Sequence, residues 1–511
     1  MIKRVVLIYV FFPVLLFGQG KTHNFLIGYT AGTDSFTTHS HGRLLFDSTT
    51  VAVTGETRKM AFRAAQGNIS DESGNLIIVS NGCWIADATG DTMQGGGGLT
   101  PLGSFTYDWC DSFAGIPFSH SCIVIPFPGD SNKYMLLHQT GDYSFGGDVA
   151  PNLMYSEIDL SLNGGLGVVT QKSQILINDT LFPNVAACRH ANGRDWWIIA
   201  FKEGTNKVYK ILLDSSGFSS VTIQTLNVPP ASFNGGQPLF SRDGKKFAYA
   251  DFYGTFGAAI HNVRLMDFDR CTGMFSNEQV IDITDSISGF GLAFSSDSKY
   301  LYASSYLNIF QMCVDSSNVS LTKQIVATND VFLSPYLPLY TNFFLMYLAA
   351  NGKIYLSSGN SVVDYHFINY PDSAGIACDV HLHDLHLPCY SARGNVNHPN
   401  YYLGCDTTSG CPCLTTGIPS LWGGQGGAYD FKFSLSPNPT NGNIKIMYLL
   451  PQNSKGLFEV FDVTGKIVFS MPLPQWSTLQ NFNLVFLSGG VYSCVITSGD
   501  LRVSKKLVVV K

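Results

Sequence analysis

One kind of turn recurs along the chain and constrains its fold more than any other feature. Its clearest copy is 240–250, where an apolar strand end meets Asp243-Gly244 and a second strand of aromatic and small apolar residues follows. Glycine supplies the positive φ that a tight hairpin turn requires. The pattern returns, complete or in looser form, in five further segments: 70–77, 129–135, 190–197, 294–303 and 349–356.

The copies are separated by a nearly constant length of chain. The turn positions are 74, 132, 193, 244, 298 and 352, which gives spacings of 58, 61, 51, 54 and 54 residues. That period suits one four-stranded blade of a β-propeller. Because a blade is covered on both faces by its neighbours, its inner strands are expected to be almost continuously apolar, as 76–79 and 196–200 are.

The motif Ser-x-Asp-Gly-Lys-x-Phe resembles the repeat of TolB-type and WD40-like propellers. Other segments resemble a group of exported Bacteroidetes propeller proteins with uncharacterised or gliding-motility-like labels: 66–71, 81–85, 188–197, 268–273 and 398–401. The resemblance implies an exported, all-β propeller. This family resemblance implies no particular activity.

Two groups of strand-like residues lie outside the repeats. The runs 25–29 and 43–47 precede the first repeat, and 396–404 follows the sixth. Propellers often close by combining strands from the two ends of the chain, because closure removes exposed strand edges. We therefore predict seven blades, with 25–46 paired beside 397–403. Six blades is the alternative.

The amino terminus predicts a signal peptide at 1–20. The basic residues Lys3 and Arg4 precede the apolar run 5–17, and a small-x-small motif typical of a cleavage site follows at 18–20. A membrane span needs about 20 apolar residues, and the first cysteine is Cys83, far from the position of a lipoprotein anchor. The propeller is then expected at 21–413, in a mature protein without a membrane span.

Export gives the 12 cysteines a meaning, because disulfides persist in oxidising compartments. The pairs predicted from local spacing are Cys378 with Cys389, and Cys405 with Cys411 or Cys413. Cys405-x5-Cys411-x-Cys413 lacks the Cys-x2-Cys spacing of structural zinc sites. A metal cluster at 381–386 is the weaker interpretation of that His-rich run, which is expected to be an exposed outer strand. No metal and no cofactor are predicted.

A Gly-rich linker is predicted at 414–431 and a separate domain at 432–511. Ile444, Ile446 and Tyr448 alternate as in a strand, and Asp462 and Gly465 suit a tight turn between two strands. Apolar runs at 491–497 and 503–510 complete a small Ig-like β-sandwich.

This tail resembles the type A C-terminal sorting domain of the Bacteroidetes type IX secretion system. The residues that carry the resemblance are Pro437, Asn438, Pro439, Gly442, Asp462, Gly465, Lys466, Gly490, Tyr492, Lys505 and Lys506. It implies handling by the type IX secretion machinery and its sorting protease, and a protein that is secreted or displayed at the cell surface. The alternative is an ordinary accessory sandwich. Cys494 inside a strand departs from the pattern.

Several function classes are disfavoured. Charged residues make up 13% of the chain and the net charge is −6, which supplies no basic surface for nucleic acid. A nucleophile elbow, a phosphate loop and a His-Glu-x-x-His motif are not evident, so no catalytic residue is assigned. The repeated Asp of the turns is interpreted as turn chemistry.

Polar residues at the innermost strands are the candidate ligand-binding residues: Arg63, Gln66, His120, Arg189, His190, Gln237, Asn397 and His398. A purely structural role is the more ordinary interpretation of these residues, because polar side chains around a water-filled channel are a standard need of propeller packing. The predicted function is a binding or adhesion module for a glycan or a protein. The alternative is a hydrolase acting on polysaccharide or peptide, which requires a carboxylate pair or a His-carboxylate pair at the channel mouth.

Overall fold

The computed structural model describes residues 20–29, 37–47, 49–111, 114–145, 149–228, 236–253, 260–283, 291–334, 339–414, 433–448, 450, 456–473, 479–498 and 501–511. It divides the chain into two compact units, Met1–Ile418 and Pro419–Lys511. The predicted signal peptide, except Gly20, and the predicted linker, except Leu414, lie outside the described residues.

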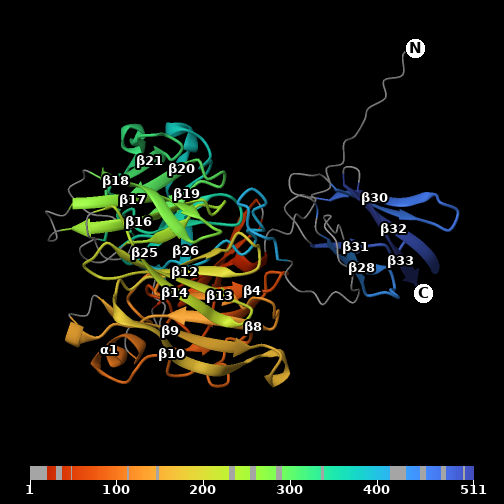
Figure 1. Ribbon diagram of the computed structural model, residues 1–511, viewed down its shortest axis with the longest axis horizontal. Coiled ribbons are helices and arrows are strands. Elements are labelled where there is room, and N and C mark those ends of the chain that lie inside the picture. Colours follow the sequence, from red (N-terminus) through yellow and green to blue (C-terminus); the bar gives the residue numbers. More distant parts are fainter. Residues whose placement is uncertain are drawn as a thin grey trace, which may run out of the picture. The chain divides into compact units, whose positions relative to one another are not determined.

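Seven antiparallel sheets follow one another through the described part of the first unit (Figure 1). The first two are β1 (Asn24–Ile27), β2 (His41–Phe46) and β3 (Val51–Glu56), then β4 (Gly67–Ser70), β5 (Leu76–Ser80) and β6 (Ile85–Ala86). The third and fourth are β7 (Cys122–Pro126), β8 (Lys133–His138), β9 (Ala150–Asp159) and β10 (Val168–Leu181), then β11 (Ala186–Arg189), β12 (Trp196–Phe201), β13 (Lys207–Asp214) and β14 (Gly217–Thr225).

The remaining three sheets have four strands each. They are β15 (Pro238–Phe240), β16 (Lys246–Tyr253), β17 (Ile260–Asp269) and β18 (Met274–Ile283), then β19 (Leu292–Phe294), β20 (Tyr300–Ser304), β21 (Asn308–Cys313) and β22 (Gln324–Thr328), then β23 (Met346–Leu348), β24 (Ile354–Leu356), β25 (Val362–Ile368) and β26 (Val380–Ser391). The first strands of neighbouring sheets contact one another, β4 with β7, β11 with β15, β15 with β19 and β19 with β23. The seven sheets therefore form a seven-bladed propeller, as predicted.

Short helical turns lie before and between these strands. They are η1 (Gly20–Thr22), α1 (Ser104–Thr106), η2 (Tyr107–Asp111), η3 (Tyr143–Phe145), η4 (Asn163–Gly165), η5 (Val319–Thr322) and η6 (Gly375–Cys378). Across the described residues, no helix has the length and apolar character needed to cross a membrane.

The repeated turns use Asp as the sequence predicts. In the turn between β15 and β16, Asp243 Oδ1 accepts the Lys245 N–H at 3.0 Å, and Gly244 has φ +73°. In the next blade, Asp297 Oδ1 accepts the Lys299 N–H at 3.0 Å. A carboxylate that satisfies a turn N–H stabilises the hairpin locally. Turn formation therefore accounts for the repeated Asp.

Blade interfaces form the core. All six residues of β12 and all five of β20 are buried, because each of these strands lies between two neighbouring sheets. The last blade also packs against the first sheet, where Tyr347 contacts the rings of Phe25 and Phe46. These contacts join the two ends of the ring.

The predicted closure by pairing 25–46 with 397–403 is wrong. Among the described strands β1 pairs with β2 alone, and 397–403 forms no strand. The reason lies in the side-chain amide of Gln66, the residue before β4. Gln66 accepts the Leu26 N–H at 2.9 Å and donates to the Leu26 carbonyl at 2.7 Å, so it occupies the main-chain groups that a closing strand would need.

Three disulfides occur among the described cysteines: Cys83–Cys110, Cys271–Cys411 and Cys405–Cys413. The predicted pair Cys405–Cys413 is therefore confirmed, whereas the predicted pair Cys378–Cys389 is wrong. Cys378 and Cys389 are buried thiols that belong to separate apolar clusters, one beside the sixth blade and one beside the first sheet.

The second unit is the predicted sandwich. One sheet contains β27 (Phe433–Ser436), β28 (Asn443–Tyr448) and β31 (Leu479–Asn483), and the other contains β29 (Gly456–Phe461), β30 (Ile467–Leu473), β32 (Gly490–Ser498) and β33 (Leu501–Val509). Phe458 and Phe482 come from different sheets and stack at 4.9 Å between ring centroids, which closes the core.

Candidate functional site

Residues 395–404, which we call the axial segment, run along the channel of the propeller. At its beginning, the Asn397 N–H donates to the Gln66 carbonyl at 2.9 Å. The Asn397 side-chain amide donates to the carbonyls of His120 at 3.3 Å and Val185 at 2.8 Å. These acceptors lie near the starts of three successive inner strands, β4, β7 and β11.

The second half of the axial segment meets the other end of the inner strands. Asn400 Nδ2 donates to the carbonyl of Arg242 at 2.7 Å, just after β15. The Tyr401 hydroxyl donates to the carbonyl of Val124 at 2.7 Å, within β7. The axial segment therefore crosses the ring in the same direction as the inner strands and occupies part of the channel with its own side chains.

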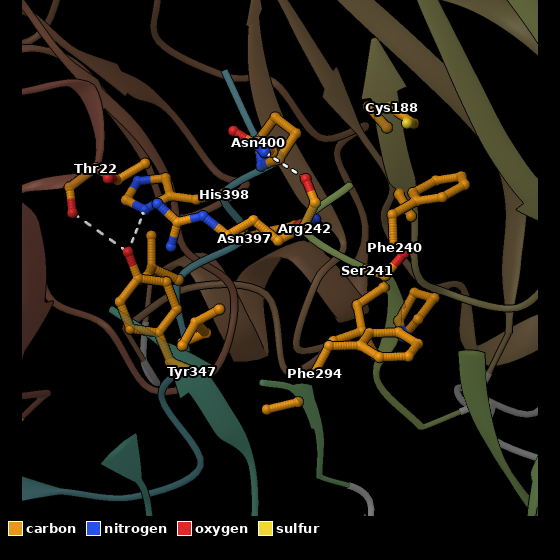
Figure 2. A pocket seen from close by; sticks show the side chains of 18 of the residues that line it. Thr22, Cys188, Phe240, Ser241, Arg242, Phe294, Tyr347, Asn397, His398 and Asn400 are labelled. Atoms are coloured by element: carbon orange, nitrogen blue, oxygen red, sulfur yellow. Dashed lines mark hydrogen bonds between the residues drawn. The ribbon is translucent and has the colours of Figure 1, made fainter. Parts of the chain in front are cut away.

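A pocket of about 140 Å³ remains beside the axial segment, along the inner strands (Figure 2). Its wall comes from all of β11, β15, β19 and β23, from Ile123 of β7, from η1 and from the axial segment. The polar side chains of its lining include Thr22, Arg189, Ser241, Arg242, Tyr347, His398 and Asn400. In Figure 2 the side chain of Arg242 extends across the pocket toward Tyr347 and His398.

Two arginines give the pocket its charge. Burial lowers the pKa of Arg242, against a smaller electrostatic attraction from Asp372 and Tyr347 that raises it. Burial likewise lowers the pKa of Arg189 to about 10. The Arg189 guanidinium lies 4.3 Å from the ring centroid of Trp196 and donates to the carbonyl of Arg194 at 2.7 Å. Both guanidinium groups remain protonated at neutral pH.

His398 is neutral and fixed on both sides. Its Nε2 lies 2.9 Å from Asn68 Oδ1, and its Nδ1 lies 2.8 Å from the Tyr347 hydroxyl. Burial lowers the pKa of His398 to about 3. Because an amide oxygen is only an acceptor, Nε2 carries the proton and Nδ1 accepts from Tyr347. The imidazole therefore adds no positive charge to the pocket.

Acidic side chains are missing from the described lining of the pocket, which contains neither Asp nor Glu. Asp372 is exposed, and its carboxylate binds Ser296 Oγ at 2.5 Å and the Asp297 N–H at 2.9 Å. With two arginines and a neutral histidine, the lining is cationic. Cys188 adds a thiol whose pKa burial raises to about 12, so it stays protonated.

Five of the eight predicted site residues line this pocket: His120, Arg189, Gln237, Asn397 and His398. Gln237 is buried and joins two blades. Its Oε1 accepts the N–H groups of Leu292 at 3.2 Å and Met346 at 3.1 Å. Its amide donates to the Met346 carbonyl at 2.6 Å. Gln237 thus holds inner strands together, and its binding of a ligand remains a prediction.

The other three predicted residues lie outside the lining. Gln66 binds the main chain of β1 as described above. Arg63 lies between two rings, 5.6 Å from the centroid of Tyr29 and 5.9 Å from that of Trp109. His190 packs on Trp197, and its Nδ1 accepts the Asn192 N–H at 3.0 Å. Of the pair expected to face the channel, Arg189 lines the pocket and His190 does not.

The sequence interpretation missed Arg242, Tyr347 and Asn400. A signal for Arg242 was nevertheless present in the repeats. The position that it takes in its turn holds Ser296 in the next blade and Ala350 in the one after that. Arg242 places a long, positively charged side chain where the equivalent turns of the next two blades have small residues. This difference indicates a role other than turn formation.

The His-rich run on β26 pairs with carboxylates. His381 Nδ1 lies 2.9 Å from Asp384 Oδ2, and its Nε2 lies 3.1 Å from Asp379 Oδ2. The hydrogen bond to Asp384 is the largest cause that raises the pKa of His381. Within the described ranges, no group of three or more His, Cys, Asp or Glu side chains is arranged to hold a metal ion.

Comparison with known proteins decides the identity of the second unit. The family model of the secretion system C-terminal sorting domain matches residues 434–510. The chain carries a sorting domain of this family. The protein is therefore exported by the type IX secretion system to the cell surface or the extracellular space, as the sequence predicted.

The structure shows how the two ends of the sorting domain depend on each other. Asn438, in its first motif, donates to the carbonyl of Lys506 at 2.7 Å and accepts the Val508 N–H at 2.8 Å. In the middle motif, Asp462 Oδ1 accepts the Lys466 N–H at 3.0 Å, and Gly465 has φ +82°. Cys494 is a buried thiol in the core.

Among curated proteins, no sequence match is found. Among solved structures, one similar chain is a functionally unknown protein from Desulfotomaculum acetoxidans, 11% identical, with a TM-score of 0.36, covering 72% of this chain and 96% of its own. Another is a quinonprotein alcohol dehydrogenase-like protein from Bacteroides thetaiotaomicron, 11% identical, with a TM-score of 0.34, covering 72% of this chain and 76% of its own. These likenesses carry no functional argument.

Proposed function

We propose that the propeller is a binding module delivered to the cell surface or beyond, and that its ligand enters the pocket at the end of the channel. The observation that carries the proposal is the pocket itself, a concave site on the ring axis with several polar side chains converging on it. The axial segment occupies the channel beside this pocket and leaves a cavity that suits a small ligand.

The alternative of a hydrolase receives no support from the pocket. A glycoside or peptide hydrolase of the predicted kind needs a carboxylate pair or a His-carboxylate pair within hydrogen-bond reach. The described lining provides neither, and His398 is held by Tyr347 and Asn68. We therefore propose binding as the function.

A pocket-filling substitution tests this proposal. Ala350 lines the pocket and is partly exposed, so Ala350→Trp places a large side chain inside it. The chain lacking residues 1–19 is screened on a glycan array, with a protein-capture screen against cell-envelope fractions in parallel. We expect Ala350→Trp to abolish the signals that the unmodified chain gives.

The matched control is Leu321→Trp, which adds the same side chain at a position that is 83% exposed on the surface of the propeller. It should leave binding unchanged. Equal binding by the unmodified chain and by Ala350→Trp, with both folded, would place the ligand elsewhere on the molecule.

We also propose the processing that the sorting domain implies. The sorting protease would separate the propeller from residues 432–511 by cutting within about 414–435. The support lies on the propeller side of the boundary. The Leu414 N–H donates to the Asn192 carbonyl at 2.9 Å, and Cys413 is tied to Cys405. A cut beyond Leu414 therefore leaves the propeller intact, and we expect the mature protein to begin near Gln19 to Lys21.

A further inference from the structure

We propose that the pocket takes a compact anion and that Arg242 is the residue that recognises its carboxylate, phosphate or sulfate group. This inference rests on the proposed function and specifies its ligand. It is carried by the placement of the guanidinium inside the pocket, by the cationic lining and by the size of the cavity.

The placement of Arg242 is unusual for a turn residue. Its backbone is fixed by Asn400, which binds the Arg242 carbonyl at 2.7 Å. Its neighbour Ser241 is buried, and Ser241 Oγ binds Asp243 Oδ1 at 2.6 Å. From this fixed base the side chain extends across the pocket rather than into solvent (Figure 2). The guanidinium is therefore held in advance at the place where a ligand would lie.

The surroundings favour an anionic ligand over a neutral one. Arg242 brings a positive charge to a lining that contains no carboxylate in its described residues, and Arg189 adds a second one that Asp195, outside the lining, attracts. A partly desolvated guanidinium binds a planar or tetrahedral oxyanion more strongly than a neutral group, because its N–H donors can form hydrogen bonds with two oxygens at once. Asp372 attracts Arg242 from the exposed rim, outside the lining, and leaves the interior of the pocket cationic.

The volume limits the size of the ligand. The share of liquid volume taken by one water is about 30 Å³, and a cavity of about 150 Å³ holds one benzene molecule, so the 140 Å³ of the pocket corresponds to about five waters or one small molecule. An anion of the size of phosphate or sulfate fits whole, and a larger one, such as a single sugar acid, would enter with its carboxylate end. A longer polymer would enter with one terminal unit.

The test compares charged and neutral probes on the chain lacking residues 1–19. Titration calorimetry measures glucuronate, glucose, inorganic phosphate and sulfate at low and high salt. We expect glucuronate to bind and glucose not to bind. Phosphate and sulfate should compete with glucuronate if the oxyanion alone is recognised. Affinity should fall as salt is raised, because the interaction is between charges.

Three variants test whether Arg242 is the residue that binds the anion. Arg242→Gln should weaken the binding of the anion roughly tenfold or more, the usual effect of losing a hydrogen bond to a charged group. Arg242→Lys should restore part of the affinity, since the charge returns without the fork. Lys245→Gln is the matched control, because it removes a positive charge from the same turn at an exposed position outside the lining, and it should bind as the unmodified chain does.

The outcomes separate this inference from the proposed function. Binding of a neutral ligand that Ala350→Trp abolishes and Arg242→Gln leaves unchanged overturns the anion assignment and keeps the pocket. Anion binding that Ala350→Trp leaves unchanged overturns the pocket as the site. Binding of none of the four probes overturns the inference, as does an equal loss of affinity in Arg242→Gln and Lys245→Gln.

Discussion

At the scale of residues, buried histidines set how the propeller responds to pH. Burial lowers the pKa of His120 and His138 to about 4, and that of His366 and His398 to about 3. In the unfolded chain these groups titrate near 6.5. Between about 6.5 and 4 the unfolded state therefore binds more protons than the native state, so stability is full above pH 6.5 and is lost as the pH falls.

The pH prediction can be checked at His398. We expect the midpoint of urea unfolding to fall as the pH is lowered from 7 to 4.5, and His398→Gln to make that dependence shallower by about one proton. His386→Gln is the control, because the side chain of His386 is 68% exposed, and it should keep the original slope. A slope that is identical in His398→Gln and in the unmodified chain would contradict the account of a neutral, buried His398.

At the scale of elements, the axial segment connects the blades through side-chain hydrogen bonds and forms no strand. It carries the polar groups that join blades two to five across the channel, and it continues into 405–414, where two disulfides attach it to the fifth blade and to itself. The Cys271–Cys411 bond links residues 140 apart in sequence, so it closes a long loop of the unfolded chain. Cross-links of long loops stabilise most by restricting the unfolded state.

We expect the double variant Cys271→Ser/Cys411→Ser to unfold at a lower urea concentration, with a loss of about 2–5 kcal/mol. Cys313→Ser is the matched control, since Cys313 is an unpaired and only partly buried thiol, and it should change stability little. The readout is urea unfolding of the chain lacking residues 1–19, followed by tryptophan fluorescence with and without reductant. Equal stability of the double variant and the unmodified chain would show that the bond does not hold the axial segment.

The elements also show which parts of the structure the sequence could predict. Turn residues such as Asp243 and Gly244 act locally, so the blades could be predicted from their repeats. The position of 397–403 depends on Gln66 and Asn68, whose side chains reach β1 from a different blade. The partner of Cys271 is likewise set by ring closure, at a separation of 140 residues. Arg242 was missed because its proposed role depends on where Tyr347 and His398, which come from other parts of the ring, place the pocket.

At the scale of the whole molecule, the chain is a cargo joined to its delivery signal. The propeller and the sorting domain are separate compact units, each with its own core. Within the sorting domain, β33 pairs with β32 along nine residues, and Leu507 and Val509 are buried in the core. Loss of β33 would leave an open strand edge and an incomplete core. The described sheets of the propeller do not include these residues.

The most direct test of the account is therefore cell fractionation and intact mass of the wild-type chain and of a chain lacking Val503 to Lys511. We expect wild-type material at the surface or in the medium to end within about 414–435 and to lack Lys511. The deletion should leave a folded propeller that accumulates in the periplasm. Surface material that still carries residues 436–511, or normal surface delivery of the truncated chain, would contradict the account.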